Sequence, residues 1–361
     1  MLAFDKPYNE LPLLPPKAEL ENQAILKQLI QSHKALAELK GYSELLPDKS
    51  LLLNTITLQE AKESSAIENI ITTHDALYKS LALPKSKIDK ATKEVLNYRQ
   101  ALWLGHESVL KHKLITTNTI IEIQKELEQN DAGIRKLPET KLMNDKTQEI
   151  IYTPPEGENV LRNLLSNLEH YINSNDGLTD PLIKLAVMHY QFESIHPFYD
   201  GNGRTGRILN VLYLVLNELI DSPILYLSKY IIQNKNDYYR LLQEIRTKDA
   251  WHEWILYILT GIEQTSKNTL AMIRQINDLM DSSIETVKAK LPKIYSKELI
   301  ELLFTNVYTK IGILVENGIA SRNIASKYLN SLVKIGMLTE EKIGKEALFI
   351  NQQLFDLLKN G

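Results

Sequence analysis

The stretch that decides the fold is residues 196–207, which read HPFYDGNGRTGR. Its twelve residues include a histidine, an aspartate, three glycines and two arginines. Pro197 ends any helix that runs up to it, because proline disfavours helical geometry in the preceding residue. Gly201 and Gly203 let successive backbone N–H groups turn toward one point, and the helical pattern that resumes there supplies a helix N-terminus. Together these groups predict chemistry on a polyphosphate.

The bulk composition is that of an ordinary globular protein. The chain has 361 residues, 43% hydrophobic and 24% charged, and a net charge of −3, which argues against a general binder of nucleic acid or anionic membranes. It contains no cysteine, which excludes disulfides, thiolate metal sites and cysteine nucleophiles. We see neither a signal-peptide pattern nor an apolar run long enough to span a membrane, so we expect a cytoplasmic protein.

Helical spacing of apolar residues dominates the chain from residue 18 onward. The segments expected to be helical are 19–40, 48–68, 75–81, 86–112, 116–129, 160–174, 180–195, 203–219, 234–247 and 250–284, the last broken near Gly261. A single hairpin is expected in the first 280 residues, at 141–155, where 142–143 pairs with 149–153 across a polar turn.

The pattern changes near residue 286. Short helices are expected at 296–305, 309–317 and 321–335, followed by strands at 337–341 and 347–350 around Gly344. Three short helices and a β-hairpin form the outline of a winged helix-turn-helix domain. Residues 286–361 hold 11 Lys and Arg against 7 Asp and Glu, in contrast to the net acidic remainder. This contrast favours a separate domain.

The stretch 196–207 matches the signature of the Fic (Fido) family, H-x-F-x-D/E-G-N-G-R-x-x-R, at every specified position. Ser64, Glu68 and Asn69 also match the family's inhibitory pattern, S/T-x-x-x-E-G/N. The chain therefore resembles class II Fic adenylyltransferases, which carry an N-terminal inhibitory helix. The resemblance implies a mainly α fold in three parts. These are an N-terminal helical region 1–105 with the inhibitory helix at about 55–70, a Fic core 106–285 with a flap at 141–155, and a winged-helix domain 286–361.

The reaction that the resemblance implies is AMPylation, the transfer of AMP from ATP to a Ser, Thr or Tyr hydroxyl with release of pyrophosphate. His196 would act as general base, a role that suits imidazole at neutral pH. Asp200 would hold Mg²⁺, which takes few protein carboxylates besides phosphate oxygens. The ATP site implied by the resemblance comprises Gly201, Asn202, Gly203, Arg204, Thr205, Gly206 and Arg207, with Tyr239 lining the adenine pocket.

Glu68 has a separate, inhibitory role by the same resemblance. Ser64 and Glu68 lie four residues apart and share a helical face, and Asn69 tolerates the left-handed conformation that ends a helix. Glu68 would pair with Arg207 and take the place that the γ-phosphate needs. ATP would then bind with its α-phosphate out of line with the attacking hydroxyl.

The resemblance also implies partners. The strand 149–153 of the flap would pair with the backbone of a target protein and present its hydroxyl. Self-AMPylation is a further expectation, since the chain has 17 tyrosines. Related proteins often form homodimers, which implies self-association here too.

Two alternatives remain open at this point. In the first, the protein is a DNA-binding regulator whose Fic core acts as a sensor, with Arg322, Lys327 and Lys334 on the basic face of the winged helix. In the second, the same fold transfers phosphate or phosphocholine, or removes AMP from modified proteins. The intact Gly201–Gly203 element and Arg207 favour ATP bound with its triphosphate inward, and hence AMP transfer.

Overall fold

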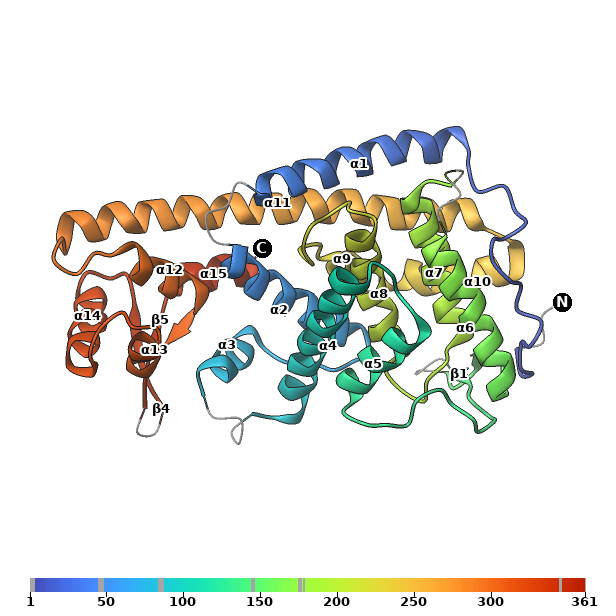
Figure 1. Ribbon diagram of the computed structural model, residues 1–361, viewed down its shortest axis with the longest axis horizontal. Helices are drawn as coiled ribbons and strands as arrows, with labels where there is room; N and C mark the ends of the chain where they lie inside the picture. Colours follow the sequence, from blue (N-terminus) through green and yellow to red (C-terminus); the bar gives the residue numbers. More distant parts are fainter. Residues whose placement is uncertain are drawn as a thin grey trace.

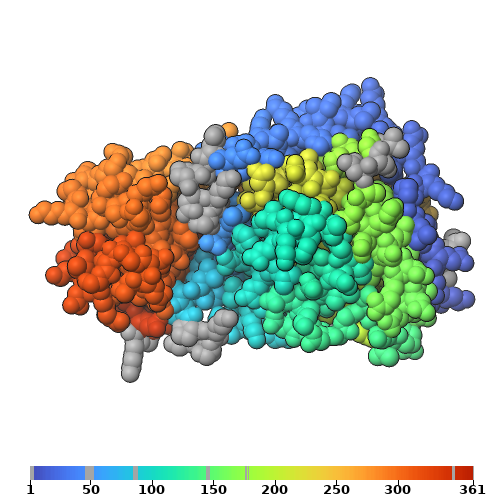
Figure 2. Space-filling model, viewed as in Figure 1, coloured from blue at the N-terminus to red at the C-terminus, as the bar shows by residue number. Residues whose placement is uncertain are grey.

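The computed structural model describes residues 4–44, 49–83, 88–143, 147–174, 177, 179–343 and 346–360. The fold is mainly α-helical with two small sheets, as the sequence predicted (Figure 1). The molecule is elongated, and the C-terminal segment forms one end of it (Figure 2). None of the helices in the described ranges is both long and apolar enough to cross a membrane.

Two long helices lie side by side along one edge of the molecule (Figure 1). They are α1 (Gln23–Glu44) and α11 (Trp251–Lys290). Helix α1 begins four residues later than predicted, because the Asn22 side chain accepts a hydrogen bond from the Ile25 N–H (2.9 Å) and so caps the helix.

The predicted break of α11 at Gly261 is wrong, since this helix continues unbroken through the glycine. Gly261 instead allows close packing: a Cβ atom there would lie 2.7 Å from Cδ1 of Tyr230. Tyr230 belongs to the short helix α9 (Leu227–Gln233), which the periodicity did not reveal. Glycine here serves helix–helix contact and not helix termination.

The central helices follow the predicted segments closely. They are α2 (Lys49–Ile67), α3 (His74–Ala82), α4 (Lys90–His112), α5 (Thr117–Glu128), α6 (Glu158–Asn173), α7 (Pro181–Ile195), α8 (Asn202–Leu216) and α10 (Lys235–Lys248). Helix α4 starts later than the predicted Ser86, because the Asp89 side chain accepts from Thr92 N–H and caps the helix. Helices α7 and α8 are buried nearly throughout and form the centre of the core.

The predicted hairpin is present as β1 (Leu142–Met143) and β2 (Ile150–Tyr152), paired antiparallel with Leu142 opposite Tyr152. Residues 144–146 of its turn lie outside the described residues. An N-terminal arm runs along the end of β2: Tyr8 N–H donates to Thr153 C=O (3.0 Å), and Thr153 Oγ1 donates to Phe4 C=O (2.6 Å).

The C-terminal segment has the three predicted helices, α12 (Lys297–Thr305), α13 (Ile311–Glu316) and α14 (Arg322–Lys334). A three-stranded sheet of order β3-β5-β4 joins β3 (Tyr308–Thr309), β4 (Thr339–Ile343) and β5 (Glu346–Ile350). The strand β3 and the final helix α15 (Gln352–Asn360) were not predicted. Gly344, the predicted turn centre, lies outside the described residues.

Two boundaries in this segment differ from prediction for a local reason. The strand expected at 337–341 begins only at Thr339, because the N–H groups of Met337 and Leu338 donate to Leu332 C=O at the end of α14 (3.0 and 3.4 Å). Helix α13 begins at Ile311 and not at residue 309, since Thr309 pairs with Phe349 in the sheet.

Candidate active site

The motif forms the connection between α7 and α8. His196 follows α7 in the left-handed conformation (φ 47°), and its N–H closes the last turn on Phe192 C=O (3.0 Å). The Asn202 side chain bonds both to the N–H and to the C=O of Phe198 (2.9 and 2.8 Å), which closes the loop on itself. Phe198 is fully buried, in line with its predicted packing role.

A second brace comes from Arg135, which sequence reasoning missed. Its Nε donates to His196 C=O (2.7 Å), its Nη2 donates to Pro155 C=O, and its backbone N–H donates to Pro197 C=O (2.9 Å). The side chain is 1% exposed. Arg135 thus ties the histidine loop to the end of the flap segment. No spacing signal links a residue 61 positions away to the motif.

His196 is uncharged at neutral pH, although its lowered pKa makes it a weaker base than a free imidazole. Burial lowers the pKa of its imidazole to about 4, and the Arg135 charge acts in the same direction. The ring is therefore uncharged at pH 7. Its Nδ1 is buried and finds no hydrogen-bond partner among the described residues.

Asp200 is exposed at the mouth of the loop. Its Oδ1 accepts the Gly201 N–H (2.7 Å), and its C=O accepts Gln124 Nε2 (3.2 Å). The described residues contain no group of three or more His, Cys, Asp or Glu side chains placed to hold a metal. A lone, solvent-facing carboxylate beside a helix N-terminus fits Mg²⁺, which would complete its shell with phosphate oxygens and water.

The start of α8 provides the anion-binding backbone. Gly201 adopts φ 79°, and the first helical bond runs from Thr205 N–H to Gly201 C=O (2.9 Å). The N–H groups of the three residues before Thr205 therefore precede the helical ladder and point outward from the helix end. Thr205 is itself buried, and a Cβ atom on Gly206 would lie 2.5 Å from Glu193 Oε1. The place of both residues in an ATP site stays a prediction.

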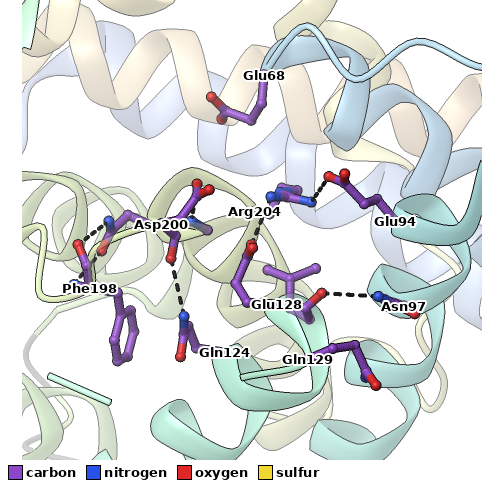
Figure 3. Close-up of polar contacts among 12 residues, drawn as sticks. Glu68, Glu94, Asn97, Gln124, Glu128, Gln129, Phe198, Asp200 and Arg204 are labelled. Atoms are coloured by element: carbon purple, nitrogen blue, oxygen red, sulfur yellow. Dashed lines mark hydrogen bonds and ion pairs between the residues drawn. The ribbon is translucent and has the colours of Figure 1, made fainter. Parts of the chain in front are cut away.

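Arg204 is 3% exposed and engaged by two carboxylates of the core. Its Nη2 donates to Glu128 Oε1 (2.7 Å) and its Nη1 to Glu94 Oε2 (3.4 Å), as Figure 3 shows. Burial raises the pKa of Glu128, while the Arg204 charge lowers it. Arg204 therefore lies at the start of α8 with both terminal nitrogens of its guanidinium already paired, and its predicted contact with ATP stays a prediction.

Helix α5 holds the loop with two residues one turn apart. Gln124 bonds to Asp200 C=O (Figure 3). Glu128 occupies the space beside Gly201 where a Cβ atom would project. Gly201 is therefore needed both for its positive φ and for the approach of Glu128. Neither Gln124 nor Glu128 was predicted, because a helical glutamate or glutamine carries no signal of its own.

Arg207 is 2% exposed and bound to the segment that carries the predicted inhibitory pattern. Its Nε donates to Ser64 Oγ (2.7 Å), and its Nη2 donates to Ser64 C=O (2.9 Å) and Glu68 Oε1 (2.7 Å). Thus the structure brings together Ser64, Glu68 and Arg207, which are up to 143 residues apart in sequence.

Glu68 enters the site directly after α2, on the opposite side of Arg204 from Glu128 in the view of Figure 3. Burial favours a higher pKa for Glu68, but the charges of Arg207, Arg204 and Lys235 outweigh it and hold the pKa below its ordinary value. Its carboxylate lies where a Cβ atom on Gly203 would project, so it sits directly on the first turn of α8. Glu68 thus occupies the place where an anion would meet this helix end.

Tyr239 lies at the edge of the same region. Its ring is 44% exposed, and Lys235 Nζ lies 5.9 Å from the ring centroid. The same ammonium donates to Ile67 C=O (2.6 Å), the last residue of α2. The adjacent Tyr238 is the core residue: it is buried, and its hydroxyl bonds His189 Nε2 (2.9 Å).

The flap strand lies beside α10. Ile151 is 37% exposed, and its C=O accepts Gln243 Nε2 (3.1 Å). Next to it, the Arg246 guanidinium lies 3.8 Å from the ring centroid of Tyr152. These contacts fix the position of β2 relative to α10.

Three family models match consecutive parts of this chain. The Fic/DOC family N-terminal model matches residues 26–107, and the Fic/DOC family model matches 114–214. The model for the C-terminal domain of SoFic-like protein adenylyltransferases matches residues 279–354. The mainly helical fold and the loop between α7 and α8 agree with these matches, and the chain belongs to the Fic/DOC family.

Curated relatives carry the same assignment. The chain is 25% identical over 261 residues to the protein adenylyltransferase Fic of Nematostella vectensis, which covers 71% of this chain and 58% of that protein. It is 25% identical over 232 residues to the protein adenylyltransferase fic-1 of Caenorhabditis briggsae, and this match covers 63% of this chain and 42% of that protein. The chain therefore spans about half the length of the curated relatives it matches.

Solved structures share the fold. A Fic family protein from Desulfovibrio desulfuricans superposes with a TM-score of 0.58 at 17% identity, covering 92% of this chain and 97% of that one. Fic-1 from C. elegans superposes with a TM-score of 0.54 at 22% identity, and the match covers 70% of this chain and 73% of that one.

Proposed function

We propose that this protein transfers AMP from ATP to a side-chain hydroxyl of a protein, and that Glu68 restrains this activity by pairing with Arg207. The observation that carries the proposal is the buried Arg207, held by Ser64 and Glu68 at the anion-binding end of α8. A buried guanidinium beside a helix N-terminus is a phosphate site, and here a carboxylate fills it. The names of the curated relatives support the choice of AMP transfer.

In the proposed reaction His196 acts as general base. The target hydroxyl gives its proton to the neutral imidazole while its oxygen bonds to the α-phosphorus of ATP. The bond from the α-phosphorus to the bridging oxygen of the β-phosphate breaks, and pyrophosphate leaves. Arg135 keeps His196 in place through the backbone carbonyl of that residue.

The phosphates would lie on the first turn of α8, against the N–H groups that precede the helical ladder. Arg207 would contribute a bidentate contact to the terminal phosphate once Glu68 withdraws. Asp200 would hold Mg²⁺, which when bound neutralises phosphate charge. Arg204 would add its charge to the site from its fixed position between Glu94 and Glu128.

A target protein would dock on the flap strand β2, as the sequence suggested. Ile151 offers an exposed side chain there, and Gln243 would yield its contact with the Ile151 carbonyl to an incoming strand. Self-AMPylation, homodimer formation, Tyr239 at the adenine and the division at residues 105 and 285 all remain predictions.

ATP labelled on the α-phosphate tests the proposal. With a cell lysate as acceptor, Glu68→Gly should label proteins strongly, the wild type weakly, and Glu68→Gly/His196→Ala not at all. A general base contributes about 10²–10⁴-fold to rate, so the loss should be nearly complete. Equal labelling by wild type and Glu68→Gly would contradict the restraint by Glu68.

The same assay with ATP labelled on the γ-phosphate separates the alternatives. Incorporation of the γ-label would indicate phosphate transfer in place of AMP transfer. Release of AMP from a labelled protein would indicate removal of the modification. The winged-helix assignment and DNA binding by the C-terminal domain also remain predictions, which a gel-shift assay with duplex DNA at several salt concentrations tests.

A further inference from the structure

Glu68 lies in a short connection whose position is set at both ends. Its N–H donates to Ser65 C=O and the Ile70 N–H donates to the same carbonyl (both 3.0 Å), so the turn is closed on the end of α2. Only residues 69–73 separate Glu68 from α3. Whatever holds α2 and α3 therefore also determines where the Glu68 carboxylate lies.

The C-terminal domain contacts α2 through α15 and α12. Gln59 Nε2 donates to Leu358 C=O in α15 (2.6 Å), and both residues are buried. Helix α12 also contacts α2. Gln59 lies within α2, nine positions before Glu68, which follows the end of this helix, so the contact acts on the rigid element that leads to Glu68.

The same domain also contacts α3 through a polar cluster of Asp75, Lys79, Tyr308 and Glu341, which we call the Lys79–Tyr308 cluster. Tyr308 Oη donates to Asp75 Oδ1 (2.6 Å). Lys79 Nζ lies 2.9 Å from Asp75 Oδ2 and 2.8 Å from Glu341 Oε1. The Tyr78 ring meets the edge of Phe355 with centroids 6.1 Å apart.

The two helices differ in how they are held elsewhere. Helix α2 is also fixed to the core by the buried Glu60, which accepts hydrogen bonds from Tyr98 Oη and Ser228 N–H (both 3.0 Å). In the segment leading into α3, Thr72 Oγ1 is hydrogen-bonded to Thr92 Oγ1 of the core (2.6 Å). The Lys79 cluster is partly exposed, with Asp75 46% and Glu341 40% accessible. Partly exposed ion pairs are weak and separable.

We propose that the C-terminal domain holds Glu68 on Arg207 by bracing α3, so that undocking of the Lys79–Tyr308 cluster is the step that opens the site. Lys79 and Tyr308 are positioning residues in this proposal, since neither touches the phosphate site. The proposal rests on the proposed function and adds a second domain to its control. Any event that separates the C-terminal domain from α3 would then release Arg207.

The variant Lys79→Met/Tyr308→Phe tests this in the full chain. It keeps side-chain volume while removing both ion pairs and the hydroxyl donor. With α-labelled ATP and lysate, AMP transfer should rise about tenfold over the wild type, the rise that a tenfold larger open fraction gives. The matched control Lys297→Met removes an exposed pair within α12, Lys297–Glu301 (3.4 Å), and should leave the rate unchanged.

Suppression distinguishes this role from a merely structural one. In the Glu68→Gly background the double change should have no effect, because the restraint is already gone. An unchanged rate with Glu68 present, or an equal rise in both backgrounds, would overturn the proposal. If Glu68→Gly itself transfers no AMP, the proposed function fails instead.

Hydrogen exchange tests the bracing role even if Glu68→Gly transfers no AMP, because it does not depend on activity. Amide hydrogen exchange of residues 65–78 should be faster in Lys79→Met/Tyr308→Phe than in wild type and Lys297→Met. Unchanged exchange of this segment would overturn the bracing role, whatever the activity.

Discussion

Arg204 and Arg207 stand one helical turn apart on α8, and both are buried, yet they are paired in different ways. Arg204 is held by Glu94 and Glu128, which belong to the core helices α4 and α5. Arg207 is held by Ser64 and Glu68, which belong to α2 and the turn after it. The first pairing is part of the scaffold, and the second joins the site to a segment outside the motif.

The partners differ in accessibility by degree. The side chains of Glu128 and Glu94 are 12% and 26% exposed, and that of Glu68 is 35% exposed. A carboxylate that reaches water can leave its partner without a large desolvation penalty, while a buried one leaves an uncompensated charge. We infer that Arg204 is fixed and that Arg207 is exchanged between Glu68 and a phosphate.

The largest expected effect is that of Arg204→Met. Two carboxylates of the core lose their partner, so the free energy of unfolding should fall by about 3 kcal/mol. Urea denaturation measures this. Arg207→Met should cost only about 1 kcal/mol, because Glu68 can turn toward water. Equal losses for the two variants would contradict the division between scaffold and switch.

Next in size is Glu128→Gln in the Glu68→Gly background. This change weakens the ion pair with Arg204 and the contact with the loop at Gly201. It should reduce kcat/KM for ATP about tenfold, because Arg204 and the loop are then held less precisely. Glu94→Gln, whose contact with Arg204 is longer at 3.4 Å, serves as the matched comparison and should have a smaller effect. A rise in activity with Glu128→Gln would mean that Arg204 too is restrained.

Ser64→Ala should have a smaller, opposite effect. It removes the hydroxyl that accepts from Arg207 Nε but keeps Glu68 and the Ser64 carbonyl. Loss of one hydrogen bond of about 1 kcal/mol should raise the basal AMP-transfer rate about fivefold. Its neighbour Ser65 provides the control, because it is equally buried on the same helix and the structure describes no contact between it and Arg207. Ser65→Ala should therefore leave the basal AMP-transfer rate unchanged.

The smallest expected effect is that of mild acid. The pKa of Glu68 is held below its ordinary value, so its pairing with Arg207 persists above that range and is lost only as pH falls through the lowered pKa. His196, with a pKa of about 4, also stays neutral there. Between pH 7 and pH 5.5, wild type should stay restrained and Glu68→Gly should stay active. A rise in wild-type activity over this interval would contradict the ion pair.

Much of this arrangement could be predicted from the sequence, for reasons that are local. The motif fixes the turn at His196, the loop and the start of α8, and the Ser64 and Glu68 spacing predicts one helical face. Partners that come from elsewhere could not be predicted. Arg135, Glu94 and Glu128 reach the loop only through packing, and their own neighbours in sequence carry no pattern.

The errors in the fold have the same origin. Gly261 was expected to break α11 because glycine is a poor helix former, but the contact with Tyr230 requires it there. The short elements α9, β3 and α15 depend on the surfaces they pack against, which local periodicity does not contain. Tertiary contacts decided each of these cases.

The most direct test of the central claim is the AMP-transfer rate of Glu68→Gln compared with wild type and with Glu63→Gln. Glu68→Gln keeps the size of the side chain and removes the charge that binds Arg207, whereas Glu63 pairs with Lys62 on the same helix (2.8 Å). The account predicts a rise of at least about tenfold for Glu68→Gln, the factor that 1.4 kcal/mol represents, and no change for Glu63→Gln. A Glu68→Gln rate equal to wild type, measured with α-labelled ATP, would contradict it.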